Sequence, residues 1–354
     1  MSRRLLHELV PGLDGFVSPV DLVRRPTPVI EEAALAARWG QGELWVKRDD
    51  LTNPLYGGSK VRNLEFFLGR ARMLGAEAVA TMGPYGSHQV LATAVFGRQQ
   101  GFLTRGLLTP QAAVREIDLN ARLLPAFSME VIRCPTFASV PWNMAKARLG
   151  RLGQSRPYWI PPGSNHPLGV MGVVEGALEV VEAVRNGTMP MPNDVVVPTG
   201  TCATAAGVYL AFAMAGLPVR VVAVRMVPMI VTGPRKMKRM AEQTLSLLRL
   251  HGFAGAVRWG DLLWVDSCAG PGYGLSNPLA DRAECDVAEA GSFRTETTYT
   301  AKSLAYLADG GLKDRRVLFW NTFSAVDPDR ARIIANTGVS NDHLPNRTPQ
   351  ECLA

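Results

Sequence analysis

Cysteine is scarce in this chain: only five of the 354 residues are cysteines, and no two of them form a C-x-x-C pair. An odd number of widely spaced cysteines argues against a disulfide framework and against a zinc site, so we expect a reducing, cytoplasmic compartment and no bound metal. The sequence also lacks a run of about 18 apolar residues, and its first 15 residues hold only a broken apolar stretch without a cleavage-like site. We therefore expect neither a membrane span nor secretion.

Lysine is scarce as well, although the formal net charge is +7: only seven of the 38 basic residues are lysines. The densest basic segment, residues 233–243, opens a helical pattern and has no neighbouring aromatic residues that could stack on nucleic-acid bases. We interpret this segment as the solvated face of a helix and expect no nucleic-acid partner. A surface that weakly attracts anions is the alternative.

The length and the hydrophobic content of 47% predict two domains, which leave room for a cleft. Short β-rich runs alternate with helical patterns, and this alternation predicts an α/β fold with a parallel sheet. The runs at 77–83, 103–109 and 129–134 belong to one block. A second series begins after the segment 156–169, which is rich in proline and glycine, so we place a domain boundary near residue 160.

One lysine stands at an unusual place, close behind two glycines in the segment PLYGGSK, residues 54–60. Apolar residues recur at helical spacing from Val61 to Leu74, so a helix is predicted to begin at about Lys60. The helix dipole disfavours a positive charge at this end by up to about 1 kcal/mol. Lys60 is therefore either simply solvated or kept uncharged for chemistry.

Three loops between predicted strands and helices carry small or hydroxyl-bearing residues. The loop 198–207, PTGTCATAAG, supplies glycine and hydroxyl groups where free helix N–H groups collect, which suits a phosphate or a simple capped helix. The loop 82–90 places Ser87 where it can cap a helix, and the His88 beside it could be an ordinary structural histidine. The loop 160–169 favours a tight turn.

Lys60 and these loops together suit a pyridoxal phosphate enzyme. An uncharged amine forms a Schiff base with the aldehyde of that cofactor, and a cup of N–H and hydroxyl groups holds its phosphate. The spacing by itself leaves the simpler structural interpretations open.

The segment LWVKRDDLTNPLYGGSKVRNLEFFL closely resembles the stretch around the cofactor lysine of fold-type II pyridoxal phosphate enzymes, in the branch of D-cysteine desulfhydrase and 1-aminocyclopropane-1-carboxylate deaminase. Six further motifs resemble this branch in order, from GPYGSHQVLATA to VLFWNT. The resemblance implies an α/β, two-domain, parallel-sheet fold like that of tryptophan synthase beta. The large cofactor-binding domain would comprise 1–62 and 161–354, the small inserted domain would comprise 63–160, and the assembly would be a homodimer.

The same resemblance implies pyridoxal 5'-phosphate as the cofactor and assigns the site residues. Lys60 matches the lysine that holds the cofactor and shuttles the α-proton. The implied catalytic residues are Lys60, Ser87, Tyr273 and Tyr299. The implied substrate-binding residues are Ser87, Gln89, Tyr273 and Tyr299. The implied cofactor-binding residues are Lys60, Asn63, His88, Thr199, Gly200, Thr201, Cys202, Ala203, Thr204 and Thr322.

Two threonines bear on the type of reaction. Thr322 matches the residue near the pyridine nitrogen of the cofactor in desulfhydrase-like members, and Thr300 stands where the deaminases carry a glutamate. A hydroxyl leaves the ring nearly neutral, which favours β-elimination over the opening of a cyclopropane. The resemblance thus implies a desulfhydrase-like lyase or deaminase that abstracts the α-proton of a small amino acid. A β-replacement synthase, or a cofactor-binding protein without turnover, is the alternative.

The chain also departs from the family pattern. His88 stands where the family has an asparagine that bonds the cofactor's 3′-oxygen, and an imidazole is larger and titrates. Asn63 replaces a lysine near the phosphate, Cys202 and Ala203 replace a pair of very small residues, and Phe323 brings a bulky ring near the cofactor. Together these departures indicate a specialised substrate or the loss of the ancestral activity.

Overall fold

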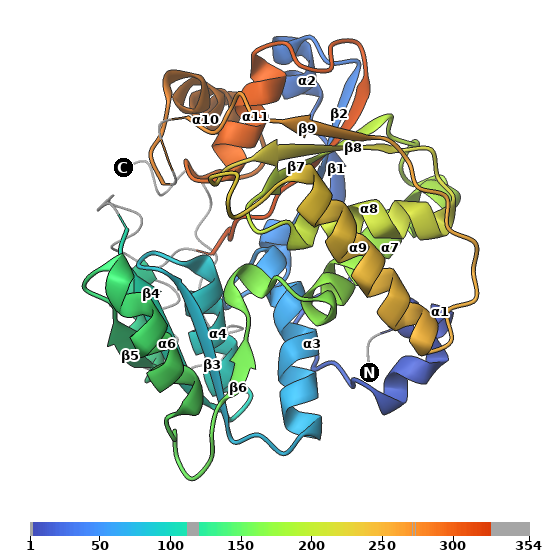
Figure 1. Cartoon of the computed structure of the whole chain (residues 1–354). Coiled ribbons are helices and arrows are strands. Elements are labelled where there is room, and N and C mark those ends of the chain that lie inside the picture. The colour runs from blue at the N-terminus through green and yellow to red at the C-terminus, as the bar shows by residue number, and fades with distance from the viewer. Residues whose placement is uncertain (1–2, 112–119, 271, 273, 327–354) are drawn as a thin grey trace.

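The computed structural model describes residues 3–111, 120–270, 272 and 274–326 and contains two separate sheets (Figure 1). The larger sheet has six strands in the order β1-β2-β10-β7-β8-β9. These strands are Val29–Glu31 (β1), Glu43–Lys47 (β2), Asp194–Thr199 (β7), Arg220–Arg225 (β8), Leu262–Val265 (β9) and Arg316–Trp320 (β10). Strand β1 runs antiparallel to β2, and the other neighbours are parallel. The predicted α/β fold with parallel strands is thus confirmed.

The smaller sheet has four parallel strands in the order β5-β4-β3-β6. They are Ala78–Pro84 (β3), Leu103–Thr109 (β4), Glu130–Arg133 (β5) and Tyr158–Ile160 (β6). The first three agree with the predicted runs to within one residue at each end. All four strands come from one continuous stretch of chain, whereas the larger sheet combines strands that precede and follow that stretch.

Helices cover both faces of the larger sheet (Figure 1). One face carries α2 (Ala33–Trp39), α10 (Pro278–Ala290) and α11 (Thr300–Ala308). The other carries α7 (Pro167–Arg185), α8 (Ala203–Ala215) and α9 (Pro234–Leu250). The remaining α-helices are α1 (Leu5–Leu9), α3 (Ser59–Met73), α4 (His88–Gln99) and α6 (Val140–Leu149). The 3₁₀ turns are Pro11–Gly15, Asp49–Leu51, Leu124–Phe127, Phe137–Ser139 and Pro162–Ser164. No described helix is both long and apolar enough to cross a membrane.

The central strands of the larger sheet are apolar because both of their faces are buried. In β7, the side chains of Val195 and Val197 lie in the core beneath α7 and α8, and Val196 lies in the core on the opposite face. Alternate side chains of a strand point to opposite faces, so a strand covered on both sides reads as a continuous apolar run. This explains the uninterrupted valines of the segment DVVV.

Helix α3, which begins with Ser59 and Lys60, is held in place by a buried ion cluster. The Arg62 guanidinium donates to both oxygens of Asp49 at 2.8 and 2.9 Å and to both oxygens of Glu179 at 2.8 and 2.9 Å. Lys47 Nζ donates to Glu179 at 2.6 Å, and Arg62, Asp49 and Lys47 are fully buried. Asp49 of the KRDD segment and Glu179 of α7 therefore anchor α3 through Arg62, and Lys47 of β2 joins the cluster through Glu179.

Candidate active site

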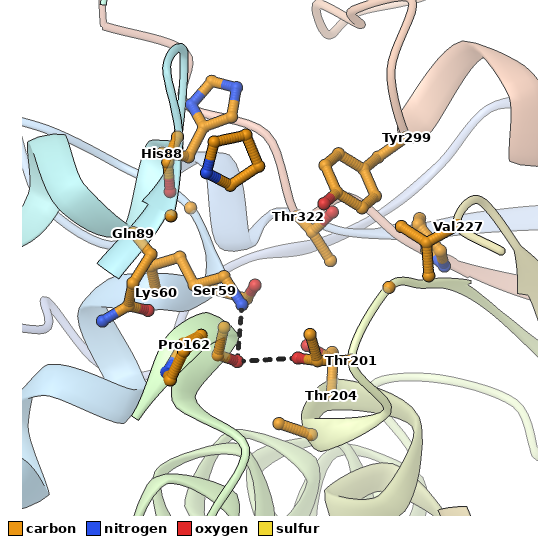
Figure 2. Close-up of a pocket in the computed structure, with 18 of the residues that line it drawn as sticks. Ser59, Lys60, His88, Gln89, Pro162, Thr201, Thr204, Val227, Tyr299 and Thr322 are labelled. Carbon is orange, nitrogen blue, oxygen red and sulfur yellow. Dashed lines mark hydrogen bonds between the residues drawn. The ribbon is translucent and has the colours of Figure 1, made fainter. Parts of the chain in front are cut away.

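A cavity of about 490 Å³ lies where the carboxyl ends of parallel strands from both sheets meet (Figure 2). Its lining comes from the starts of α3, α4 and α8 and from the segments that follow β4, β6, β8 and β10. Ligands of open α/β sheets bind at such carboxyl ends, because the loops and helix N-termini collect there. In the described ranges, no cluster of three or more histidine, cysteine or acidic side chains is placed to hold a metal ion.

Lys60 lies on the cavity wall because the two preceding glycines allow a sharp entry into α3. Gly58 has φ +97°, and a Cβ atom there would lie 2.7 Å from the Thr322 carbonyl oxygen. The Lys60 amine donates to the Gly163 carbonyl oxygen at 3.3 Å (Figure 2). Burial lowers the pKa of Lys60 to about 8, so this amine loses its proton more readily than an ordinary lysine and is partly uncharged near neutral pH.

The loop between β7 and α8 forms a cup for an anion. Cys202 has φ +77°, a left-handed conformation that explains why glycine suits this position. A Cβ atom at Gly200 would lie 3.1 Å from the Tyr299 ring, so only glycine leaves this space open. Thr204 lies in the first turn of α8 and lines the cavity, where unpaired helix N–H groups and the helix dipole favour negative charge.

Three consecutive residues at the start of α4 line the same cavity: Ser87, His88 and Gln89. The Ser87 hydroxyl accepts a hydrogen bond from the Val90 N–H at 3.4 Å and so caps the helix, as its position in the sequence predicts. The side-chain amide oxygen (Oε1) of Gln89 accepts a hydrogen bond from the Ser164 hydroxyl at 2.6 Å. These contacts hold the N-terminus of α4 at the wall of the cavity.

Tyr299 and Thr322 lie across the cavity from Lys60, His88 and Gln89 (Figure 2). Tyr299 directly precedes α11, and Thr322 follows β10 by two residues. Phe323 also lines the cavity, and its ring meets the His88 ring edge to face at a centroid distance of 5.9 Å. The bulky ring at position 323 therefore does approach the site, as the sequence predicts.

Two residues with a role in the site assigned from the sequence, Asn63 and Thr300, are not among the described lining residues of this cavity. Asn63 is buried in α3, where its amide nitrogen donates to the Gly169 carbonyl oxygen at 2.6 Å. Thr300 is buried at the first turn of α11, and its hydroxyl hydrogen-bonds to the Glu296 carbonyl oxygen at 3.2 Å. Tyr273 lies outside the described residues.

The sequence reasoning missed Glu296, which is the acidic residue in the described lining of the cavity. Its carboxylate accepts hydrogen bonds from the backbone N–H groups of Thr298, Tyr299 and Thr300 at 2.7–2.9 Å. Glu296 therefore caps α11 and fixes the position of Tyr299. An acidic residue three positions before a tyrosine at a helix start was the available signal, since a carboxylate suits a helix N-terminus.

The turn Pro162–Ser164 also contributes to the site, whereas the sequence favoured only a tight turn there. Gly163 does adopt a left-handed turn conformation, with φ +62°. However, its carbonyl oxygen accepts from the Lys60 amine and, at 3.0 Å, from the Thr201 hydroxyl (Figure 2). One backbone oxygen thus joins the candidate cofactor lysine to the anion cup.

The family model of the pyridoxal-phosphate dependent enzymes matches residues 20–322 of this chain. The chain belongs to this family. Nocardicin C-9' epimerase of Nocardia uniformis subsp. tsuyamanensis is 35% identical to this chain, over 88% of this chain and 94% of the relative. D-cysteine desulfhydrase of Klebsiella pneumoniae is 28% identical, over 82% of this chain and 88% of the relative. The crystal structure of an ACC deaminase homologue matches this pyridoxal phosphate enzyme with a TM-score of 0.75 and 24% identity, over 91% of this chain and 95% of the homologue. This match supports the fold-type II architecture.

The residues of the cavity fit pyridoxal phosphate. The cofactor needs an uncharged lysine amine for its aldehyde and a helix N-terminus for its phosphate, and a single cavity offers both. Lys60 would supply the amine, and the loop that leads into α8 would supply the anion cup. Thr322 adds a neutral hydroxyl on the opposite wall. The predicted cofactor is thus confirmed by the family, and its binding by these residues is chemically consistent.

Replacing Thr204 by valine is expected to weaken cofactor binding. A hydroxyl that donates to a charged phosphate oxygen contributes about 1.5–3 kcal/mol, so the dissociation constant of pyridoxal phosphate should rise roughly 10- to 150-fold. Thr201→Val should have a smaller effect, because the Thr201 hydroxyl already donates to Gly163. Fluorescence titration of the apoenzyme measures both constants. Thr244→Val, a buried threonine of α9 outside the cavity, is the control, and an unchanged constant for Thr204→Val would contradict the proposed cup.

Proposed function

We propose that this pyridoxal phosphate enzyme is a desulfhydrase-like lyase or deaminase that eliminates a β-substituent from a small amino acid. The observation that carries this proposal is the partly uncharged Lys60 amine in the same cavity as the phosphate cup and the neutral Thr322 hydroxyl. When bound to the amino group of a substrate, pyridoxal phosphate withdraws electrons from the α-carbon and acidifies its proton. The similarity to D-cysteine desulfhydrase supports elimination as the outcome.

In this proposal, Lys60 accepts the α-proton, since its amine is the lining group with a pKa near 8 and can hold a proton at physiological pH. The leaving group departs from the β-carbon with the bonding electron pair. Ser87 and Gln89, at the start of α4, would orient the substrate carboxylate, and Tyr299 lines the opposite wall. The products, after hydrolysis, are a 2-oxo acid, ammonia and the protonated leaving group.

Epimerisation at the α-carbon is a second candidate, because the relative with 35% identity is a nocardicin C-9' epimerase. Elimination and epimerisation share the removal of the α-proton, and they differ in the next step. In epimerisation the proton returns to the opposite face of the same carbon, and no bond to a β-substituent breaks. The fate of the β-substituent therefore separates the two functions.

Reaction of the holoenzyme with D- and L-amino acids in D₂O tests this choice. We expect a 2-oxo acid from a substrate that has a β-leaving group, such as D-cysteine. Stereoinverted amino acid with deuterium at the α-carbon, and no 2-oxo acid, would favour epimerisation instead. If neither product forms and no deuterium enters any substrate, the protein is a cofactor binder without turnover, and the proposed function is wrong.

The lining of the cavity supports a substrate with an uncharged side chain. Among the described residues that line the cavity, Lys60 and Glu296 are the only two with charged side chains. The Glu296 carboxylate already accepts hydrogen bonds from three backbone N–H groups. Phe137 and Val231 also belong to the lining and are 71% and 38% exposed, so apolar groups stand at its mouth. A second charge on the substrate would lose its hydration here without gaining a partner.

Three further expectations remain proposals of the same kind. Because the larger sheet uses strands from before and after the smaller one, we retain a large domain of 1–62 and 161–354 and a small domain of 63–160. The four described cysteines, Cys134, Cys202, Cys268 and Cys285, are free thiols, which supports a reducing, cytoplasmic location. The resemblance to the desulfhydrase branch supports a homodimer.

A further inference from the structure

His88 is clamped on one ring nitrogen by two other side chains. The Tyr56 hydroxyl lies 2.6 Å from His88 Nδ1, and the Asn120 amide nitrogen lies 3.5 Å from the same atom. Tyr56 and Asn120 are buried, and Tyr56 and His88 both line the cavity. The two partners come from different parts of the chain, before α3 and after β4, so the tertiary fold brings them together.

The orientation of Asn120 determines which nitrogen of His88 carries the proton. The Asn120 amide nitrogen donates to the Gly86 carbonyl oxygen at 3.0 Å, which fixes the NH₂ group on the side that faces the imidazole. An amide NH₂ group can only donate, so a lone pair on His88 Nδ1, in place of an N–H, suits this neighbour at 3.5 Å. With Nδ1 as an acceptor, the Tyr56 hydroxyl donates to it, and the single proton of a neutral imidazole lies on Nε2.

Burial favours the neutral form of the His88 imidazole, and the nearby charges act on it in opposite directions. Burial lowers the pKa of His88, Glu296 across the cavity raises it, and the positive charge of Lys60 lowers it again, with a net lowering. The edge-to-face contact with Phe323 adds an apolar neighbour without charge. A protonated ring would place an N–H against the Asn120 NH₂ group and force the Tyr56 hydroxyl to turn.

We propose that Tyr56 and Asn120 hold His88 as the neutral imidazole with its proton on Nε2, so that position 88 offers a fixed hydrogen-bond donor to the cofactor. An asparagine amide offers the same kind of donor without titrating, which explains how a histidine can stand in its place. Tyr56 is then a positioning residue that acts through His88. This proposal depends on the cofactor and not on whether the enzyme eliminates or epimerises.

Nitrogen NMR of the holoenzyme with ¹⁵N-labelled histidine tests the tautomer directly. The chain has five histidines, and the His88→Asn variant identifies the signals of His88 by their loss. We expect Nε2 of His88 to have the shift of a protonated ring nitrogen and Nδ1 that of an unprotonated one, unchanged through the pH range in which an ordinary imidazole titrates. A proton on Nδ1, or a titration of His88 centred near its ordinary pKa, would overturn the proposal.

The Tyr56→Phe variant tests the clamp. Without the hydroxyl, the Nδ1 lone pair becomes free to bind a proton, so the proton affinity of His88 should rise about tenfold. A His88-dependent component should then enter both the NMR titration and the visible absorption of the cofactor at a higher pH than in the wild type. The Asn120→Ala variant also removes a contact to His88 Nδ1, so it should shift the titration of His88 in the same direction.

Tyr85→Phe is the matched control, because Tyr85 lies close to α4 in the chain but outside the cavity lining. Its titration curves should follow those of the wild type. If Tyr56→Phe and Asn120→Ala also follow the wild type, neither side chain holds the tautomer and the proposal is wrong. Since these readouts do not use turnover, they stay informative even if the proposed elimination reaction is not found.

Discussion

Replacing Lys60 by alanine is expected to abolish the covalent link to pyridoxal phosphate and to lower turnover by about 10³-fold or more. The reason is the position of this amine: it lies on the cavity wall, 3.3 Å from the Gly163 carbonyl oxygen, and burial lowers its pKa to about 8. An uncharged amine can attack the aldehyde and can later accept the α-proton. The variant should lose both functions together, since one nitrogen performs both.

The measurement is borohydride reduction of the holoenzyme followed by peptide mass spectrometry. The chain has only seven lysines, so the labelled peptide identifies the residue directly. Label on Lys47 or Lys302 in place of Lys60 would refute the assignment. Both of these amines are buried, but Lys47 is paired with Glu179, and Lys302 donates to the carbonyl oxygens of Ala269 and Gly272. Lys238→Ala, on the exposed side of α9, should keep the colour and the activity of the wild type.

Replacing Arg62 by methionine is expected to lower the free energy of unfolding by about 3–5 kcal/mol. Removing one partner of a buried ion pair leaves the remaining charges without compensation, and that cost exceeds the loss of the contact itself. Arg62 is fully buried and neutralises both Asp49 and Glu179, and Asp49 also accepts from the Trp320 indole at 2.8 Å. Loss of the guanidinium therefore disturbs α3, α7 and β10 at once.

Urea unfolding of the apoenzyme, followed by far-UV circular dichroism, measures this effect. Arg38→Met is the matched control, since Arg38 also contacts two carboxylates, Asp286 and Glu289, but its side chain is 39% exposed. Water screens that pair, so the control should lose no more than about 1 kcal/mol. Equal losses in the two variants would show that the buried cluster does not anchor α3.

Local patterns along the sequence were sufficient for the elements and for the family. The periods of the apolar residues predicted the strands β3, β4 and β7 and the start of α3 beside Lys60, because a side chain's face is determined by its position within its own element. Seven motifs in order indicated the pyridoxal phosphate family, which the family match confirms. The loop 198–207 was recognised because its glycine and hydroxyl groups and the adjoining helix are adjacent in the chain.

The sequence could not show which distant groups surround each of these residues. Gly163 reaches Lys60 across 103 residues, and Tyr56 reaches His88 across 32. The lowered pKa of Lys60 and the tautomer of His88 both depend on such neighbours and on burial, and neither can be read from local spacing in the sequence. The sequence by itself therefore determined the elements, the cofactor family and the candidate residues. Only the tertiary structure decided their charge and orientation, because desolvation and hydrogen bonding depend on the groups that the fold places around a side chain.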